Sequence, residues 1–116
     1  MKENVIKTKS FTFAVEIANV SRRLVEQKEF VLSRQLLRSG TSIGANVKES
    51  MFASSRRDFA YRMTISLREC SETLFWLELL HASNYLEYQE FKILHDSANE
   101  LLRILVSITK TARKNE

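Results

Sequence analysis

The sequence contains no proline, two glycines and one cysteine in 116 residues. Proline and glycine supply most tight turns, so their scarcity favours long helices over a β-sheet fold. The single cysteine, Cys70, cannot form an intrachain disulfide and is typical of a reducing compartment. No apolar run reaches the roughly 18–20 residues of a membrane span, and the polar start MKENVIKTKS is not a secretory signal. These absences predict a cytoplasmic helical protein with no membrane contact and one domain, residues 1–116.

Apolar residues recur every three or four positions along four segments, as in amphipathic helices. The predicted helices span about residues 10–27, 31–53, 56–82 and 88–112, and the polar residues 1–9 are expected to fray. Short connections between such helices make sequential neighbours antiparallel. The predicted fold class is therefore all-α, an antiparallel up-down-up-down four-helix bundle.

Both glycines, Gly40 and Gly44, fall inside the second predicted helix. Each glycine in a helix interior costs roughly 1 kcal/mol relative to alanine, so some contact must compensate. We favour the close approach of a neighbouring helix over Gly40, Gly44 and Ala45. The alternative is a tight backbone site for a ligand, but no lysine follows the glycines in the manner of a phosphate-binding loop.

The third predicted helix has two apolar faces. One face carries Phe59, Met63 and Leu77, while the opposite face is aromatic and aliphatic as well. A chain of this length has no core large enough to bury both faces, so the second face is predicted to join copies of the chain. The predicted interface residues are Tyr61, Ile65, Glu72, Trp76 and Leu79.

A basic stripe follows the second helix. Arg34, Arg38 and Lys48 lie within an arc of about 80°, opposite the apolar residues. Repeated around an oligomer, these cations would form a positive surface for nucleic-acid phosphates; the alternative is an ordinary solvated face. The formal net charge of +4 is compatible with both. Secondary candidates for phosphate contact are three arginines at the start of the third helix: Arg56, Arg57 and Arg62.

The sequence offers no clear catalytic or metal-binding pattern. His81, His95 and Cys70 occur singly on different helices and are interpreted as structural. The GTSIG segment lacks the G-x-S-x-G spacing of a nucleophile elbow. A di-metal site in a bundle needs an E-x-x-H motif on each of two helices, and the sequence does not supply the pair. The prediction is a non-enzymatic protein without metal or cofactor.

Two segments, QLLRSGTSIGANVKE and SSRRDFAYRMTISLRECSETLFWLELL, resemble the bacterial four-helix bundle family called 23S rRNA intervening-sequence proteins. The resemblance extends from about Phe11 to Lys114. Lys48 and Cys70 depart from the small residue and the alanine that are usual in the family. The family-matching positions on the second helix are Arg38, Ser39, Gly40, Ser42, Asn46 and Glu49.

This resemblance implies an antiparallel four-helix bundle that assembles as a homopentamer. Genes of the family are found within sequences inserted in large-subunit rRNA genes. Related bundles are accessory proteins of diversity-generating retroelements, where a basic pentamer is thought to bind nucleic acid and a reverse transcriptase.

Together, the residues and the resemblance predict a non-enzymatic, oligomeric protein that binds nucleic acid, with RNA preferred to DNA. The alternative is a protein-binding scaffold, an accessory subunit for a partner enzyme without direct nucleic-acid contact.

Overall fold

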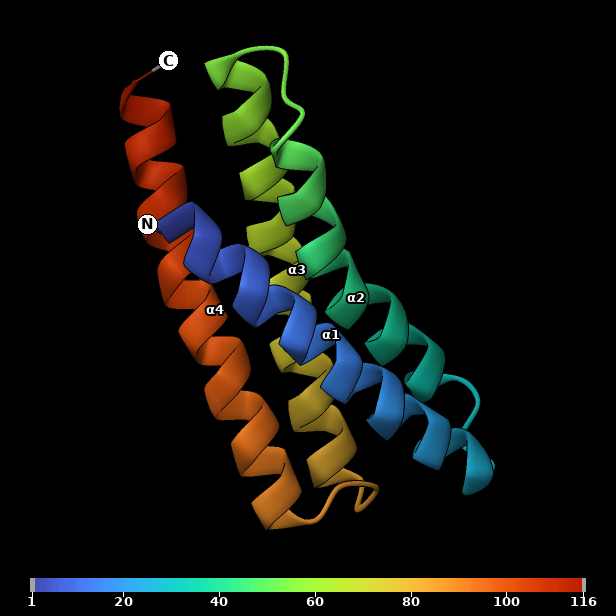
Figure 1. Ribbon diagram of the computed structural model, residues 1–116. Helices are drawn as coiled ribbons and strands as arrows, with labels where there is room; N and C mark the ends of the chain where they lie inside the picture. Colours follow the sequence, from blue (N-terminus) through green and yellow to red (C-terminus); the bar gives the residue numbers. More distant parts are fainter. Residues whose placement is uncertain (1, 116) are drawn as a thin grey trace.

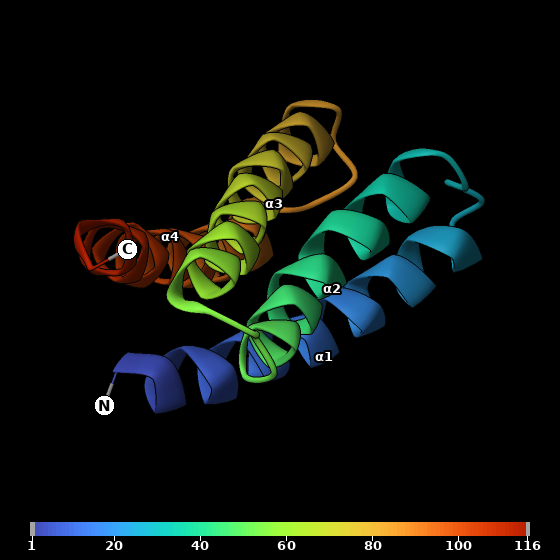
Figure 2. The ribbon, with the colours of Figure 1, turned by 90° about the horizontal axis from the view of Figure 1, so that it is seen from above.

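The computed structural model describes residues 2–115, which form four helices joined by short connections. They are α1 (Lys2–Glu26), α2 (Leu32–Ser50), α3 (Arg56–Ala82) and α4 (Tyr88–Lys114). The helices run alternately up and down in a body of 45 × 21 × 19 Å (Figure 1). Viewed from above, α1 and α2 form one pair and α3 and α4 the other (Figure 2). The predicted all-α four-helix bundle is confirmed, and no described helix is long and apolar enough to cross a membrane.

The largest departure from the predicted helices is at the start of the chain. The expectation that residues 1–9 fray is wrong for the described residues, because α1 begins at Lys2. Ile6 is fully buried and continues the apolar stripe of Phe13 and Ile17 by two further turns. Lys2 and Lys9 also reach across to α4, where they contact Ser107 and Glu100. Tertiary contacts therefore order a segment whose polar composition predicted disorder.

The other boundaries lie close to their predicted positions. The α3 helix matches its predicted range, and α4 extends two residues further, to Lys114. The α2 helix ends at Ser50, three residues before the predicted end, and Phe52 lies exposed in the turn that follows. The Ser55 hydroxyl caps α3 by accepting from the Asp58 N–H at 3.0 Å. Asp58 in turn accepts from the Ser54 N–H at 3.0 Å, which completes a capping box shifted by one residue.

Neither glycine is used in a connection between helices. The connections after α1 and α3 instead place Lys28 and Asn84 in the left-handed region, each with φ of 67°. Both glycines lie in α2, at the contact with α1. A Cβ atom added to Gly40 would lie 2.8 Å from Ile17 Cγ2, and one added to Gly44 would lie 3.3 Å from the Ser10 backbone oxygen. The predicted close helix approach over these two glycines is confirmed.

Buried hydroxyl groups join α2 to α3. Ser66 donates to the Ile43 backbone oxygen at 2.8 Å, and Thr73 donates to the Ser39 hydroxyl at 3.0 Å. All of these side chains are buried, so each bond satisfies a polar group that would otherwise be costly to remove from water. The α2 helix thus packs closely against α1 at its two glycines and is joined to α3 by buried hydroxyl hydrogen bonds.

Replacement of Gly40 by alanine tests the contact between α1 and α2. The new methyl group would overlap the branched, fully buried Ile17 side chain. We expect Gly40→Ala to lower the free energy of unfolding by about 1–3 kcal/mol despite the better helix propensity of alanine. Gly44→Ala is the matched control and is expected to change it by less than about 1 kcal/mol. Urea denaturation of both variants checks this order, which an equally stable Gly40→Ala protein would contradict.

Cys70 tests the packing between α3 and α4. Its thiol is fully buried and donates to the Ala98 backbone oxygen at 3.2 Å. Burial raises the pKa of this thiol to about 12, so almost none is thiolate at pH 8. We expect alkylation of the native protein at pH 8 to be more than about a thousandfold slower than alkylation in denaturant. Mass spectrometry over time measures both rates, and rapid labelling of the native protein would contradict the buried position.

Candidate nucleic-acid interface

The predicted basic stripe on α2 is exposed, but its three cations differ in their surroundings. Arg38 donates to Glu69 Oε2 at 3.0 Å and forms a second ion pair with Glu72, both on α3. Within the described residues, no carboxylate lies within 4 Å of the Arg34 or Lys48 side-chain nitrogens. Arg38 is therefore neutralised by its own subunit, while Arg34 and Lys48 remain available to an anion.

Most of the family-matching positions on α2 have structural contacts. Arg38 and Ser39 bind α3, and the absence of a side chain at Gly40 allows α1 to pack closely against α2. Asn46 donates to the Ser42 backbone oxygen at 2.9 Å, within α2 itself. The segment that carries the resemblance is thus largely explained by the packing of α2 between α1 and α3.

The predicted interface on α3 is only partly exposed. Tyr61 is 61% exposed. Ile65, Trp76 and Leu79 are half-buried, and Trp76 packs against the core of the same subunit. The indole N–H of Trp76 donates to Glu72 Oε1 at 3.0 Å, the carboxylate that also binds Arg38. Part of the second apolar face is therefore covered within the subunit.

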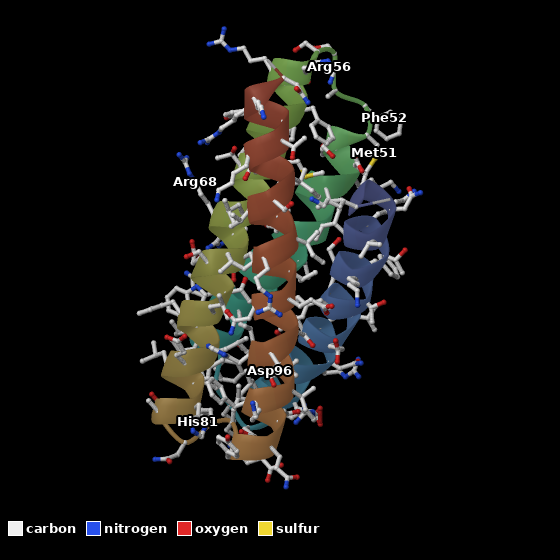
Figure 3. All side chains as sticks on the ribbon, turned by 90° about the vertical axis from the view of Figure 1, so that its left-hand side faces the viewer. Met51, Phe52, Arg56, Arg68, His81 and Asp96 are labelled. Atoms are coloured by element: carbon white, nitrogen blue, oxygen red, sulfur yellow. The ribbon has the colours of Figure 1, made fainter. Side chains whose placement is uncertain are left out.

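Charge is segregated between the two ends of the bundle. The up-down topology brings together the halves of the helices formed by residues 2–13, 41–68 and 102–115, which we call the basic end. It holds twelve of the eighteen lysines and arginines but only three acidic residues: Glu3, Glu49 and Asp58. The opposite halves, residues 14–40 and 69–101, hold six basic and ten acidic residues and form the acidic end. Figure 3 shows Arg56 and Arg68 toward one end and Asp96 toward the other.

This arrangement divides the predicted phosphate-binding residues. Lys48, Arg56, Arg57 and Arg62 lie at the basic end, whereas Arg34 and Arg38 lie at the acidic end. The sequence interpretation considered only the second helix and the start of the third. It therefore missed the other basic residues at the same end: Lys2, Lys7, Lys9, Arg68, Arg103, Lys110, Arg113 and Lys114. Assigning each charge to one end of the predicted up-down bundle would have found them.

Grooves open between helices at this end, and one of about 500 Å³ is bordered by the starts of α1 and α3 and the ends of α2 and α4. A groove of about 690 Å³ lies between α1 and α2, next to the exposed Phe11, and includes Lys7 and Lys48 in its lining. A smaller groove of about 320 Å³ lies between α3 and α4. Three arginines, one tyrosine and smaller side chains line it: Arg57, Ala60, Tyr61, Thr64, Ile65, Arg68 and Arg113.

The two histidines lie near each other despite their separation in sequence. The His81 ring stacks on Phe91 with the centroids 4.4 Å apart, and His95 lies 4.9 Å from the same phenylalanine ring. Glu78 and His81 have the E-x-x-H spacing, but Glu78 Oε2 contacts His95 Nε2 at 2.8 Å instead. Within residues 2–115, no three His, Cys, Asp or Glu side chains are grouped closely enough to hold a metal ion.

Comparison with known proteins identifies relatives over most of the chain. Residues 2–107 match the family described as 23S rRNA-intervening sequence protein. A crystal structure of a protein of unknown function from the S23 ribosomal protein family of Bacteroides thetaiotaomicron VPI-5482 is 49% identical, with a TM-score of 0.93. The match covers 95% of this chain and 99% of that one. The search of curated proteins found no match.

Proposed function

The chain belongs to the 23S rRNA-intervening sequence protein family, and from this premise we propose that it is a non-enzymatic, oligomeric nucleic-acid-binding protein of the cytoplasm. RNA is the proposed nucleic acid, because the family description refers to a ribosomal RNA intervening sequence. Phosphate binding needs only fixed positive charge, so the proposal requires no metal, cofactor or covalent step.

The observation that carries the proposal is the basic end. Three acidic residues accompany twelve basic ones there, so most of these cations have no carboxylate to neutralise them. Lys48, Arg56 and Arg57 are exposed and have no carboxylate within 4 Å in the described part of the chain. Such a surface attracts a polyanion and gains free energy by releasing its counterions. The proposed contacts are with phosphates, because no base-reading motif is present in the sequence.

The proposed surface for self-association is on α1 and α2, whereas the sequence predicted an interface on α3. Several large apolar side chains are exposed on α1 and α2, and Phe11, the most exposed of them, is 69% exposed. Other large apolar side chains exposed on these two helices are Val5, Val15, Val25 and Leu37. We propose that copies associate through this α1–α2 surface. The homopentamer remains an expectation from the family resemblance.

Charge reversal at one end of the bundle tests nucleic-acid binding. The basic-end variant combines Lys48→Glu with Arg56→Glu. We expect it to weaken binding to a labelled structured RNA at least tenfold and to reduce the slope of log affinity against log salt by about 1.5, since each lost phosphate contact removes roughly 0.7–0.9. Fluorescence anisotropy across a salt series, with a DNA of equal length for comparison, measures both quantities.

The matched control carries the same charge change at the acidic end: Arg22→Glu with Arg34→Glu. Both residues are exposed, and the described residues place no carboxylate within 4 Å of either. This control should bind within about threefold of the parent protein. Equal losses in the two variants would mean that net charge, not the basic end, determines binding. No binding by the parent protein at about 50 mM salt would overturn the proposal and favour the scaffold alternative.

Substitution of exposed phenylalanines tests the oligomer. Phe11→Glu places a charge on the α1–α2 surface without disturbing the core, and we expect it to give the subunit mass of 13.5 kDa. Phe75→Glu is the control on α3, where Phe75 is also exposed, and should keep the parent mass. Light scattering distinguishes the outcomes. Dissociation by Phe75→Glu alone would support the interface predicted on α3, and a monomeric parent protein would exclude both.

A further inference from the structure

The groove between α3 and α4 brings arginines from two helices to one place. Arg57, Tyr61, Thr64 and Arg68 follow one another at intervals of three or four residues, so they line the same side of α3. Arg113 reaches the groove from α4 and donates from Nη2 to Thr64 Oγ1 at 3.2 Å. Residues 57 and 113 are at opposite ends of their helices, and only the antiparallel packing of α3 and α4 makes them neighbours.

The three guanidinium groups of this groove have no acidic partners. Within residues 2–115, no carboxylate lies within 4 Å of Arg57, Arg68 or Arg113. The acids nearest to these arginines along α3 have other partners: Asp58 accepts from the Ser54 N–H, and Glu69 and Glu72 bind Arg38 on the α2 side of the helix. Arginine binds phosphate in a bidentate manner and is more weakly hydrated than lysine, so a groove with three unpaired arginines suits phosphate groups.

An exposed aromatic ring adds a second kind of contact. Tyr61 lines the groove while most of its side chain faces solvent. The Arg62 guanidinium carbon lies 5.9 Å from the centre of its ring, and Ile65 borders the groove on the next turn of α3. Aromatic rings beside a basic groove stack on unpaired bases, whereas the bases of a duplex already stack on one another and expose only their edges.

We propose that the α3–α4 groove binds single-stranded nucleic acid, with phosphates held by Arg57, Arg68 and Arg113 and one base stacked on the Tyr61 ring. This inference rests on the proposed function and specifies its ligand. It also assigns Tyr61 to a ligand site and not to the contact between copies of the chain. Three unpaired arginines from each copy would repel one another if two such grooves met face to face.

A comparison of strands tests the inference. The probes are a labelled 20-nucleotide RNA without secondary structure, its duplex with the complementary RNA, and a DNA single strand of the same sequence. We expect the RNA strand to bind at least tenfold more tightly than the duplex. The DNA strand should bind within about threefold of the RNA strand, because phosphates and base faces are common to both.

Variants of the groove separate stacking from charge. Tyr61→Leu keeps an apolar side chain but removes the ring, and should weaken single-strand binding about 5- to 150-fold while leaving duplex binding unchanged. Phe75→Leu is the control, since Phe75 is an exposed aromatic residue of α3 outside the groove. Arg68→Gln and Arg113→Gln should each reduce the salt slope for the single strand by about 0.7. Circular dichroism of each variant verifies that the bundle is folded.

The outcomes for this groove and for the proposed function are distinct. Equal affinity for strand and duplex, or an unchanged affinity in Tyr61→Leu, would overturn the groove assignment and leave nucleic-acid binding by the basic end in place. A tenfold preference for RNA over DNA would also overturn it, because the proposed contacts do not involve the ribose hydroxyl. No binding of any probe at about 50 mM salt would overturn both.

Discussion

The close contact between α1 and α2 is the constraint on which the rest of the bundle depends. It depends on Gly40, where even a methyl group would overlap Ile17, and Gly44 lies at a second, less tight approach to Ser10. The opposite side of α2 binds α3 through Ser39 and Thr73 and through the ion pairs of Arg38. The α2 helix is therefore the element that holds two neighbours at fixed distances. Its poor intrinsic helix propensity is offset by contacts on both sides.

This packing role of α2 explains why the family-matching residues of that helix are structural. Ser39, Gly40 and Asn46 have contacts inside the subunit, and the Arg38 charge is balanced by Glu69 and Glu72. These positions maintain the fold. Their match to the family is therefore explained without contact to a ligand. The positive charge available to a ligand lies elsewhere, where four helix halves meet at the basic end. Fold and proposed function thus use separate groups of residues, and substitution at the basic end can change binding without loss of the core.

The segregation of charge also bears on how copies of the chain could be arranged. The cations of one basic end repel those of a second copy when two basic ends meet, whereas the acidic end of a copy attracts them. Association through the sides of the helices in one direction would need apolar contacts to offset the repulsion between neighbouring basic ends, and α1 and α2 expose apolar residues along their lengths. An assembly built in this way would gather several basic ends on one face. Its positive field would then exceed that of a single subunit and would attract a polyanion more strongly.

The sequence by itself determined the four helices, because apolar residues at helical spacing and short polar connections are local signals. It also predicted the close packing at Gly40 and Gly44, since a glycine inside a helix needs a compensating contact. Tertiary structure alone decided three features. Contacts with α4 order residues 2–9; Glu69 and Glu72 neutralise Arg38; and Arg113 joins Arg57 in one groove. Each of these depends on residues far apart in the chain, whose distance is set by how the helices pack and not by their own periodicity.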